Sequence, residues 1–142
     1  MKKNLIVKMA NGFGNQMFLY AAAYSFSKKL NYNLLIDEES GVIHDLKKWK
    51  KRKRLNWVPK YELDVFNLSA KIASNNYKFL NNFSYLNRKF LKLIDKFSSK
   101  KNFIIENLDK NKNTYYSEHY FTQNYNNNIF LEGYFESEKY FK

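Results

Sequence analysis

Several residue types that define particular classes of protein are scarce or missing in this chain. It has no cysteine, which excludes disulfide bridges and thiolate metal sites and fits a reducing compartment. No apolar run approaches the roughly 18 residues that span a bilayer, and the run after residues 1–4 is too short for a signal-peptide core. The sequence therefore predicts a cytoplasmic protein, with peripheral contact at the inner face of a membrane as the alternative.

Glycine is also scarce, so its positions are informative. Two of the four glycines, Gly12 and Gly14, follow the short apolar run of residues 5–7, which predicts a buried strand over residues 3–9. After them an apolar stripe at helical spacing predicts a helix over residues 14–31, formed by Leu19, Ala22, Ala23, Phe26 and Leu30. A glycine turn between a strand and a helix binds anions, because the first N–H groups of a helix are unpaired and its dipole favours negative charge.

The remaining pattern predicts one doubly wound α/β domain over residues 1–142. Further strands are expected at residues 33–37, 103–105 and 129–131, and a solvated polar turn at residues 37–41. Residues 69–98 have helical periodicity that Asn81-Asn82 divides into two helices, and another helix is expected to begin at Phe135. Residues 109–113 are expected to form a polar loop.

Two ligands compete for the glycine turn. The dinucleotide fingerprint G-x-G-x-x-G requires an acid after the second strand, which Asp37 supplies at about the right distance. The third glycine of that fingerprint would have to be residue 17, which is Met17. The dinucleotide alternative therefore fails at one of its three glycines.

The other ligand follows from a family resemblance. The segment at residues 12–21 has the pattern G-x-G-N-Q-M-F-x-Y-A, residues 61–68 read Y-E-L-D-V-F-N-L, and residues 133–141 read G-Y-F-E-S-E-K-Y-F. In this order they resemble the bacterial α-1,2-fucosyltransferases, glycosyltransferase family 11. Glu136 stands where that family usually has glutamine.

The resemblance implies a Rossmann-like N-terminal domain of a GT-B-type enzyme that transfers L-fucose from GDP-fucose to the 2-hydroxyl of a β-galactoside. Its acceptor would be a glycan precursor of surface polysaccharide or lipopolysaccharide, and no metal is expected. The donor-binding residues would be Gly12, Phe13, Gly14, Asn15 and Gln16. Asn15 could donate to the departing phosphate or cap the helix, or do both.

The resemblance also implies that part of the enzyme is missing from these 142 residues. Family members continue into a half with the motif H-x-R-R-x-D-Y, whose arginines bind the donor pyrophosphate. The only arginines here are Arg52, Arg54 and Arg88, and neither His44 nor His119 leads such a motif. The chain is therefore expected to be truncated before the second nucleotide-binding half and inactive alone, and its catalytic residues stay unknown.

Basic residues outnumber acidic ones strongly, giving a formal net charge of +12. Enrichment in Lys, Asn, Ile, Phe and Tyr, which have A/T-rich codons, explains much of this charge, and nucleic acid is not the expected partner because no known binding pattern accompanies it. The densest run predicts a solvated surface loop, with contact to anionic membrane lipids as the alternative. It consists of Lys47, Lys48, Lys50, Lys51, Arg52, Lys53 and Arg54, with Trp49 and Trp57 nearby.

Aromatic and apolar residues elsewhere are expected mainly in packing. Burial is predicted for Leu63, Phe66 and Leu68, and core or domain packing for Leu86, Phe90, Leu93 and Phe97. An aromatic-rich region is expected to be a packed cluster, with a sugar-stacking platform as the alternative; it comprises Tyr115, Tyr116, Tyr120, Phe121 and Tyr125. Glu136 and Glu138 are expected on an exposed helix and not across a glycoside.

Overall fold

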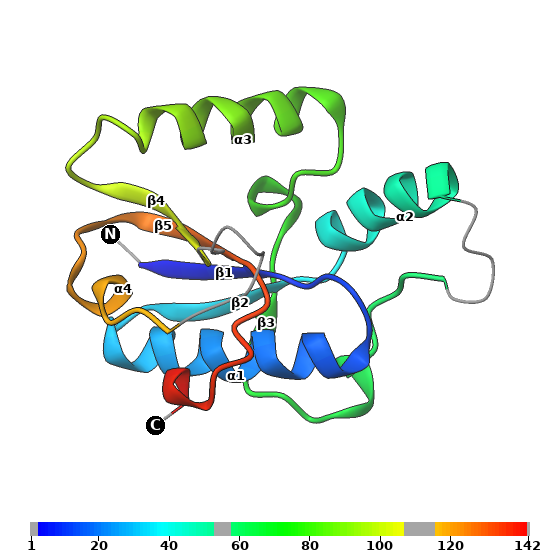
Figure 1. The fold of residues 1–142 in the computed structure, drawn as a ribbon, viewed down its shortest axis with the longest axis horizontal. Coiled ribbons are helices and arrows are strands. Elements are labelled where there is room, and N and C mark those ends of the chain that lie inside the picture. The colour runs from blue at the N-terminus through cyan, green and yellow to red at the C-terminus, as the bar shows by residue number, and fades with distance from the viewer. Residues whose placement is uncertain (1–2, 53–57, 107–115, 142) are drawn as a thin grey trace.

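A computed structural model describes residues 3–52, 58–106 and 116–141 of the chain (Figure 1). A sheet of five parallel strands forms its centre, in the order β3-β2-β1-β5-β4. The strands are β1 Asn4–Lys8, β2 Asn33–Asp37, β3 Lys71–Ile72, β4 Lys101–Ile105 and β5 Tyr125–Glu132. The α-helices are α1 Phe13–Lys29, α2 Ser40–Arg52, α3 Asn82–Ile94 and α4 His119–Thr122, and single 3-10 turns occupy Leu63–Val65, Asn75–Tyr77 and Glu138–Tyr140.

The sheet has the predicted α/β architecture and is compatible with a Rossmann-like fold. β1 lies in its middle, and Leu5, Ile6 and Val7 are at most 1% exposed because helices and loops cover both faces. The order β3-β2-β1 is that of a mononucleotide-binding half, whereas the next two strands are placed β5-β4. The predicted strands at residues 33–37, 103–105 and 129–131 are confirmed, the last two as parts of longer strands.

Helix α1 covers one face of the sheet, and α3 lies on the other (Figure 1). The predicted apolar stripe of α1 is confirmed, since Leu19, Ala22, Ala23 and Phe26 are fully buried. The Phe26 ring stacks on Phe121 at a centroid distance of 4.5 Å and meets the edges of Tyr120 and Phe135. The described part of the aromatic-rich region is therefore a packed cluster against α1; Tyr115 and the predicted loop at residues 109–113 lie outside the described residues.

The predicted solvated turn at residues 37–41 is wrong, because α2 begins there. The buried Asp37 carboxylate accepts the N–H groups of Glu39 (3.2 Å) and Ser40 (2.9 Å), which satisfies donors at the start of the helix. The basic run is accordingly helical from Lys47 to Arg52 and is not a loop. Its Lys53 and Arg54, like Trp57, lie outside the described residues, so membrane contact through this run stays a prediction.

Two predicted helices are also wrong. Residues 69–80 form β3 and a 3-10 turn, because Lys71 and Ile72 pair with the edge of β2. Only the second helix of that region exists, and Asn81 caps it in a reciprocal capping box with Ser84. At the carboxyl end, positive φ angles at Gly133 (155°) and Phe135 (53°) turn the chain sharply, so that a single 3-10 turn replaces the expected helix.

Burial differs from the prediction at several apolar positions. Leu63 is buried and Leu68 is half-buried as expected, but Phe66 is 46% exposed. The stripe at Leu86, Phe90, Leu93 and Phe97 faces solvent instead of packing in the core. Within the part of the chain that the structure describes, no helix is long and apolar enough to cross a membrane.

Candidate functional site

The glycine turn joins the carboxyl end of β1 to the first turn of α1. Gly12 is the N-cap residue in an extended conformation, and the first intrahelical bond runs from the Gln16 N–H to the Gly12 carbonyl at 3.1 Å. The N–H groups of residues 13–15 precede that bond and so have no partner within the helix. Asn15 therefore lies inside the first turn, and its predicted role as N-cap is wrong because the helix starts two residues earlier.

The Gln16 side chain holds this turn against a distant segment. It is fully buried, its Nε2 donates to the carbonyls of Asn11 (3.0 Å) and Lys60 (2.7 Å), and its Oε1 accepts the N–H of Glu62 (2.9 Å). All three bonds go to backbone groups. Gln16 thus positions the turn through its amide, whereas the predicted donor contact through Gln16 stays a prediction.

Replacing Gln16 with leucine is expected to lower the free energy of unfolding by about 2 kcal/mol, because its buried amide bonds three backbone groups, at Asn11, Lys60 and Glu62, that then lose their partner. Urea denaturation followed by circular dichroism measures this change. Asn15→Leu is the matched control on the neighbouring, half-exposed position, where we expect a change within about 0.5 kcal/mol. Equal losses in both variants would contradict the clamping role of Gln16.

A pocket of about 570 Å³ opens at the carboxyl end of the sheet, where ligands of parallel α/β sheets bind. The ends of β1, β4 and β5 form its floor, and α2 and α3 form its walls. Its lining includes Ala10 and Asn11, which directly precede the glycine turn, but the predicted residues 12–16 are not part of it. The lining comprises Lys8, Ala10, Asn11, Gly41, His44, Asp45, Lys47, Asn82, Tyr85, Arg88, Ile105, Glu132, Gly133 and Tyr134.

Three cations surround one buried carboxylate that lines this pocket. Glu132, the last residue of β5, accepts from Arg88 Nε at 2.7 Å and from Lys92 Nζ at 2.7 Å, and Arg88 also donates through Nη2. Lys8 Nζ, at the end of β1, lies 3.4 Å from the same carboxylate. Burial alone would raise the pKa of Glu132, but the Arg88 hydrogen bond and the three positive charges outweigh it and lower that pKa to about 2. One permanent anion against three cations leaves a positive surplus.

His44, on α2, is an uncharged ring in this setting. Burial, followed by repulsion from Lys8 and Arg88, lowers its pKa from 6.5 to about 4. Its ring meets the edge of Tyr85 at a centroid distance of 5.1 Å. The next residue, Asp45, accepts the Asn11 N–H at 2.8 Å and so supports a backbone with a positive φ of 62°.

The depressed pKa of His44 predicts a pH dependence of stability. Between pH 6.5 and 4 the unfolded chain binds a proton at this ring that the folded protein does not. The contribution of the uncharged ring to the free energy of unfolding is therefore complete above pH 6.5 and is lost as the pH falls toward 4. Between pH 7 and 5 we expect a loss of about 1–2 kcal/mol in the free energy of unfolding. Urea denaturation at both values measures it, and in His44→Gln this share of the dependence should vanish. An identical pH dependence in the variant would contradict the assignment.

Sequence reasoning did not single out Lys8, Asp45, Arg88 or Glu132. Their signal was positional: charged residues at the carboxyl ends of two buried strands are unusual, and Lys8 and Glu132 end β1 and β5. That these two strands are neighbours could not be read from the sequence, in which Lys8 and Glu132 are 124 positions apart. The sequence drew attention to His44, but not to the charges of Lys8 and Arg88 or to the contact with Tyr85.

Two other ligands were considered from the sequence, a dinucleotide held by Asp37 and a metal ion. Asp37 is 1% exposed, and its carboxylate accepts backbone N–H groups of α2, so it is not presented to a ribose as the dinucleotide alternative required. Burial raises the pKa of this carboxyl against those bonds and the charge of Lys78. Over residues 3–52, 58–106 and 116–141, no group of three or more His, Cys, Asp and Glu side chains could hold a metal ion.

The three segments that carry the family resemblance meet around α1. Gln16 in the first segment bonds to the chain at Lys60 and Glu62, and Phe13 stacks on Phe66 of the second segment at 5.9 Å. Phe135 and Tyr140 of the third segment pack on Phe26, with centroid distances of 5.8 and 5.9 Å.

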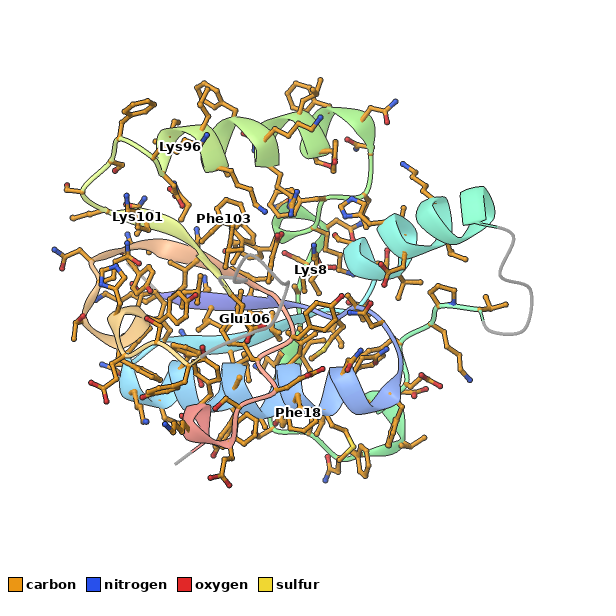
Figure 2. All side chains as sticks on the ribbon, in the orientation of Figure 1. Lys8, Phe18, Lys96, Lys101, Phe103 and Glu106 are labelled. Atoms are coloured by element: carbon orange, nitrogen blue, oxygen red, sulfur yellow. The ribbon has the colours of Figure 1, made fainter. Side chains whose placement is uncertain are left out.

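One carboxylate fixes the turn that opens the third segment. Glu106, after β4, accepts the N–H groups of Tyr134 and Phe135 through Oε2, each at 2.7 Å. Figure 2 shows Glu106 and Lys8 at the same end of the sheet.

Comparison with known proteins gave no match to any family model, curated protein or solved structure.

Proposed function

We propose that residues 1–142 form the N-terminal, Rossmann-like half of a GT-B-type α-1,2-fucosyltransferase. The observation that carries this proposal is the convergence just described: segments 12–21, 61–68 and 133–141 are remote in sequence, yet they contact one another or share α1 as a common partner. Residues that resemble one family and also form one structural unit are more informative than three separate matches.

The donor would be GDP-fucose, whose departing diphosphate gains negative charge during transfer. Two features at the carboxyl end of the sheet suit that charge: the unpaired first-turn N–H groups of residues 13–15, and the positive surplus of Lys8, Arg88 and Lys92 around Glu132. The first belongs to the predicted donor residues, and the second adds a field from the neighbouring pocket. Gly12, Phe13, Gly14 and Asn15 remain the proposed donor contacts, and no metal is required.

Gly14 supports a ligand close to the turn. It lies in the exposed first turn of α1, and a Cβ placed there would meet no atom within 4 Å. Glycine inside a helix costs about 0.5–1 kcal/mol relative to alanine, and the chain itself gives no steric reason to accept that cost. A bound diphosphate approaching the backbone would supply the reason.

The acceptor would be a β-galactoside in a precursor of surface polysaccharide or lipopolysaccharide, and the donor arginines of H-x-R-R-x-D-Y would come from a second half. The test is transfer of fucose from GDP-fucose to lactose by the protein expressed from the natural gene, with residues 1–142 assayed beside it. We expect 2-O-fucosyl product from the former and none from the latter. Product from residues 1–142 alone would refute the need for a second half, and no product from either would refute the function.

The turn itself can be tested in the protein of the natural gene by Gly14→Ala. We expect a more stable protein, by about 0.5–1 kcal/mol, that binds GDP-fucose at least about tenfold more weakly because the added methyl group blocks approach to the amides. Calorimetric titration and urea denaturation measure the two effects. Unchanged donor affinity in the variant would place the diphosphate elsewhere.

A further inference from the structure

Helix α3 carries an apolar stripe on its solvent side. Phe83, Leu86, Phe90 and Leu93 lie on α3 and Phe97 in the turn after it, and they are 82%, 61%, 60%, 53% and 87% exposed. Their spacings of three, four, three and four residues place them in one line along the helix. Figure 2 shows ring side chains on the side of α3 that faces away from the sheet.

The opposite side of α3 is held to the sheet by polar contacts. Arg88 and Lys92 reach Glu132 of β5, and all thirteen residues of α3 are described without any of them being buried. A surface helix normally turns its apolar stripe toward the core, so α3 is reversed. This arrangement leaves about four turns of apolar surface to be covered by something outside the described chain.

The charges around the stripe specify the partner. Residues 82–101 contain six basic residues and one acidic residue, Asp95. The Asp95 carboxylate is committed to the N–H groups of Asn102 and Phe103 at 2.9 Å. Lys89 and Lys96, both exposed, flank the stripe seven residues apart. An apolar line bordered by lysines without exposed carboxylates fits a partner that is apolar inside and anionic at its surface.

A second copy of this helix does not meet that requirement. Two copies paired along the stripe in antiparallel orientation would place lysines at Lys89 and Lys96 opposite lysines, and such pairs repel. In parallel orientation these lysines would face Asn87 or Ile94, neither of which is acidic. The helix also forms an outer ridge of the molecule (Figure 1) and not a groove into which another helix would fit.

We propose that α3 docks on the surface of an anionic lipid bilayer. The helix lies parallel to the membrane, Phe83, Phe90 and Phe97 enter the boundary between headgroups and acyl chains, and Lys89 and Lys96 contact lipid phosphates. This surface is distinct from the basic run at residues 47–54, and it does not depend on the proposed transferase activity.

The test is flotation of the purified 142-residue chain with vesicles of phosphatidylcholine alone or with added phosphatidylglycerol. We expect binding to the anionic vesicles that falls at least about tenfold in the triple variant L86Q/F90Q/L93Q and in K89E/K96E. The matched control V58Q/V65Q changes exposed apolar residues elsewhere, which are 67% and 76% exposed, and should bind like the parent chain. Circular dichroism of each variant confirms that the fold is kept.

Insertion itself can be read from a single label, because the chain has no cysteine. A polarity-sensitive fluorophore on Phe90→Cys should shift to shorter wavelength with anionic vesicles, and the same label on the exposed Ser74→Cys should not. Absence of a shift at position 90, or equal binding to uncharged vesicles, would overturn the proposal. A dimer in sedimentation equilibrium that the triple variant abolishes, without vesicle binding by the parent, would overturn it in favour of a second copy.

Discussion

Replacing Glu132 with glutamine is expected to lower the free energy of unfolding by about 3–5 kcal/mol. The substitution keeps the shape of the side chain but removes the negative charge that pairs with Lys8, Arg88 and Lys92. The Lys8 and Arg88 side chains are 16% and 12% exposed, so water cannot replace the lost partner fully. The three cations would then repel one another without a counter-charge between them. Guanidinium denaturation at pH 7, followed by circular dichroism, measures the loss.

Glu62→Gln is the matched control for this charge effect. Its carboxylate pairs with Lys60 at 3.9 Å, but that lysine side chain is 70% exposed, and exposed pairs contribute little. We expect a change within about 0.5 kcal/mol. The pH dependence of stability provides a second check. The pKa of Glu132 is about 2 in the folded protein and near 4.5 in the unfolded chain. Its contribution to the free energy of unfolding is therefore complete above pH 4.5 and is lost as the pH falls toward 2. A loss below 1 kcal/mol for Glu132→Gln would show that the cluster is dispensable.

Replacing Gly41 with alanine is expected to cost about 3 kcal/mol, near the upper end for overpacking. Gly41 begins α2 directly against the end of β1, and an added Cβ would lie 1.9 Å from the Met9 carbonyl oxygen and 2.8 Å from its carbon. These are backbone atoms, which cannot turn aside as a side chain would. The helix must therefore move away from the strand, carrying His44 and Asp45 out of the pocket and breaking the bond from Asn11 to Asp45.

Gly14→Ala provides the opposite result from the same chemical change. Gly14 also lies in the first turn of a helix, but a Cβ there meets nothing within 4 Å, so alanine should stabilise the protein by about 0.5–1 kcal/mol. Thermal unfolding of both variants measures the contrast. If Gly41→Ala were as stable as the parent chain, α2 could not be packed against β1 as described.

All the strands except β3, together with the first helix, could be predicted because each depends on a local pattern. Leu5–Val7 form a short apolar run between polar residues, and the stripe from Leu19 to Phe26 repeats at helical spacing. Both patterns are buried in the structure. The glycine turn was predictable for the same reason, since a strand, two glycines and a helix follow within a few residues. Periodicity says which face is apolar, however, and not what covers it.

Tertiary contacts decided the parts that the sequence could not. The α3 stripe has the same spacing as a buried one, yet the salt bridges of Arg88 and Lys92 to Glu132 turn it outward. Asp37 has the spacing of a ribose ligand, but its carboxylate accepts hydrogen bonds from the N–H groups at the start of α2. Lys8 and Glu132 lie at opposite ends of the chain and meet only because β1 and β5 are adjacent in the sheet. The charged pocket is therefore a property of strand order, which long-range pairing determines and no local pattern contains.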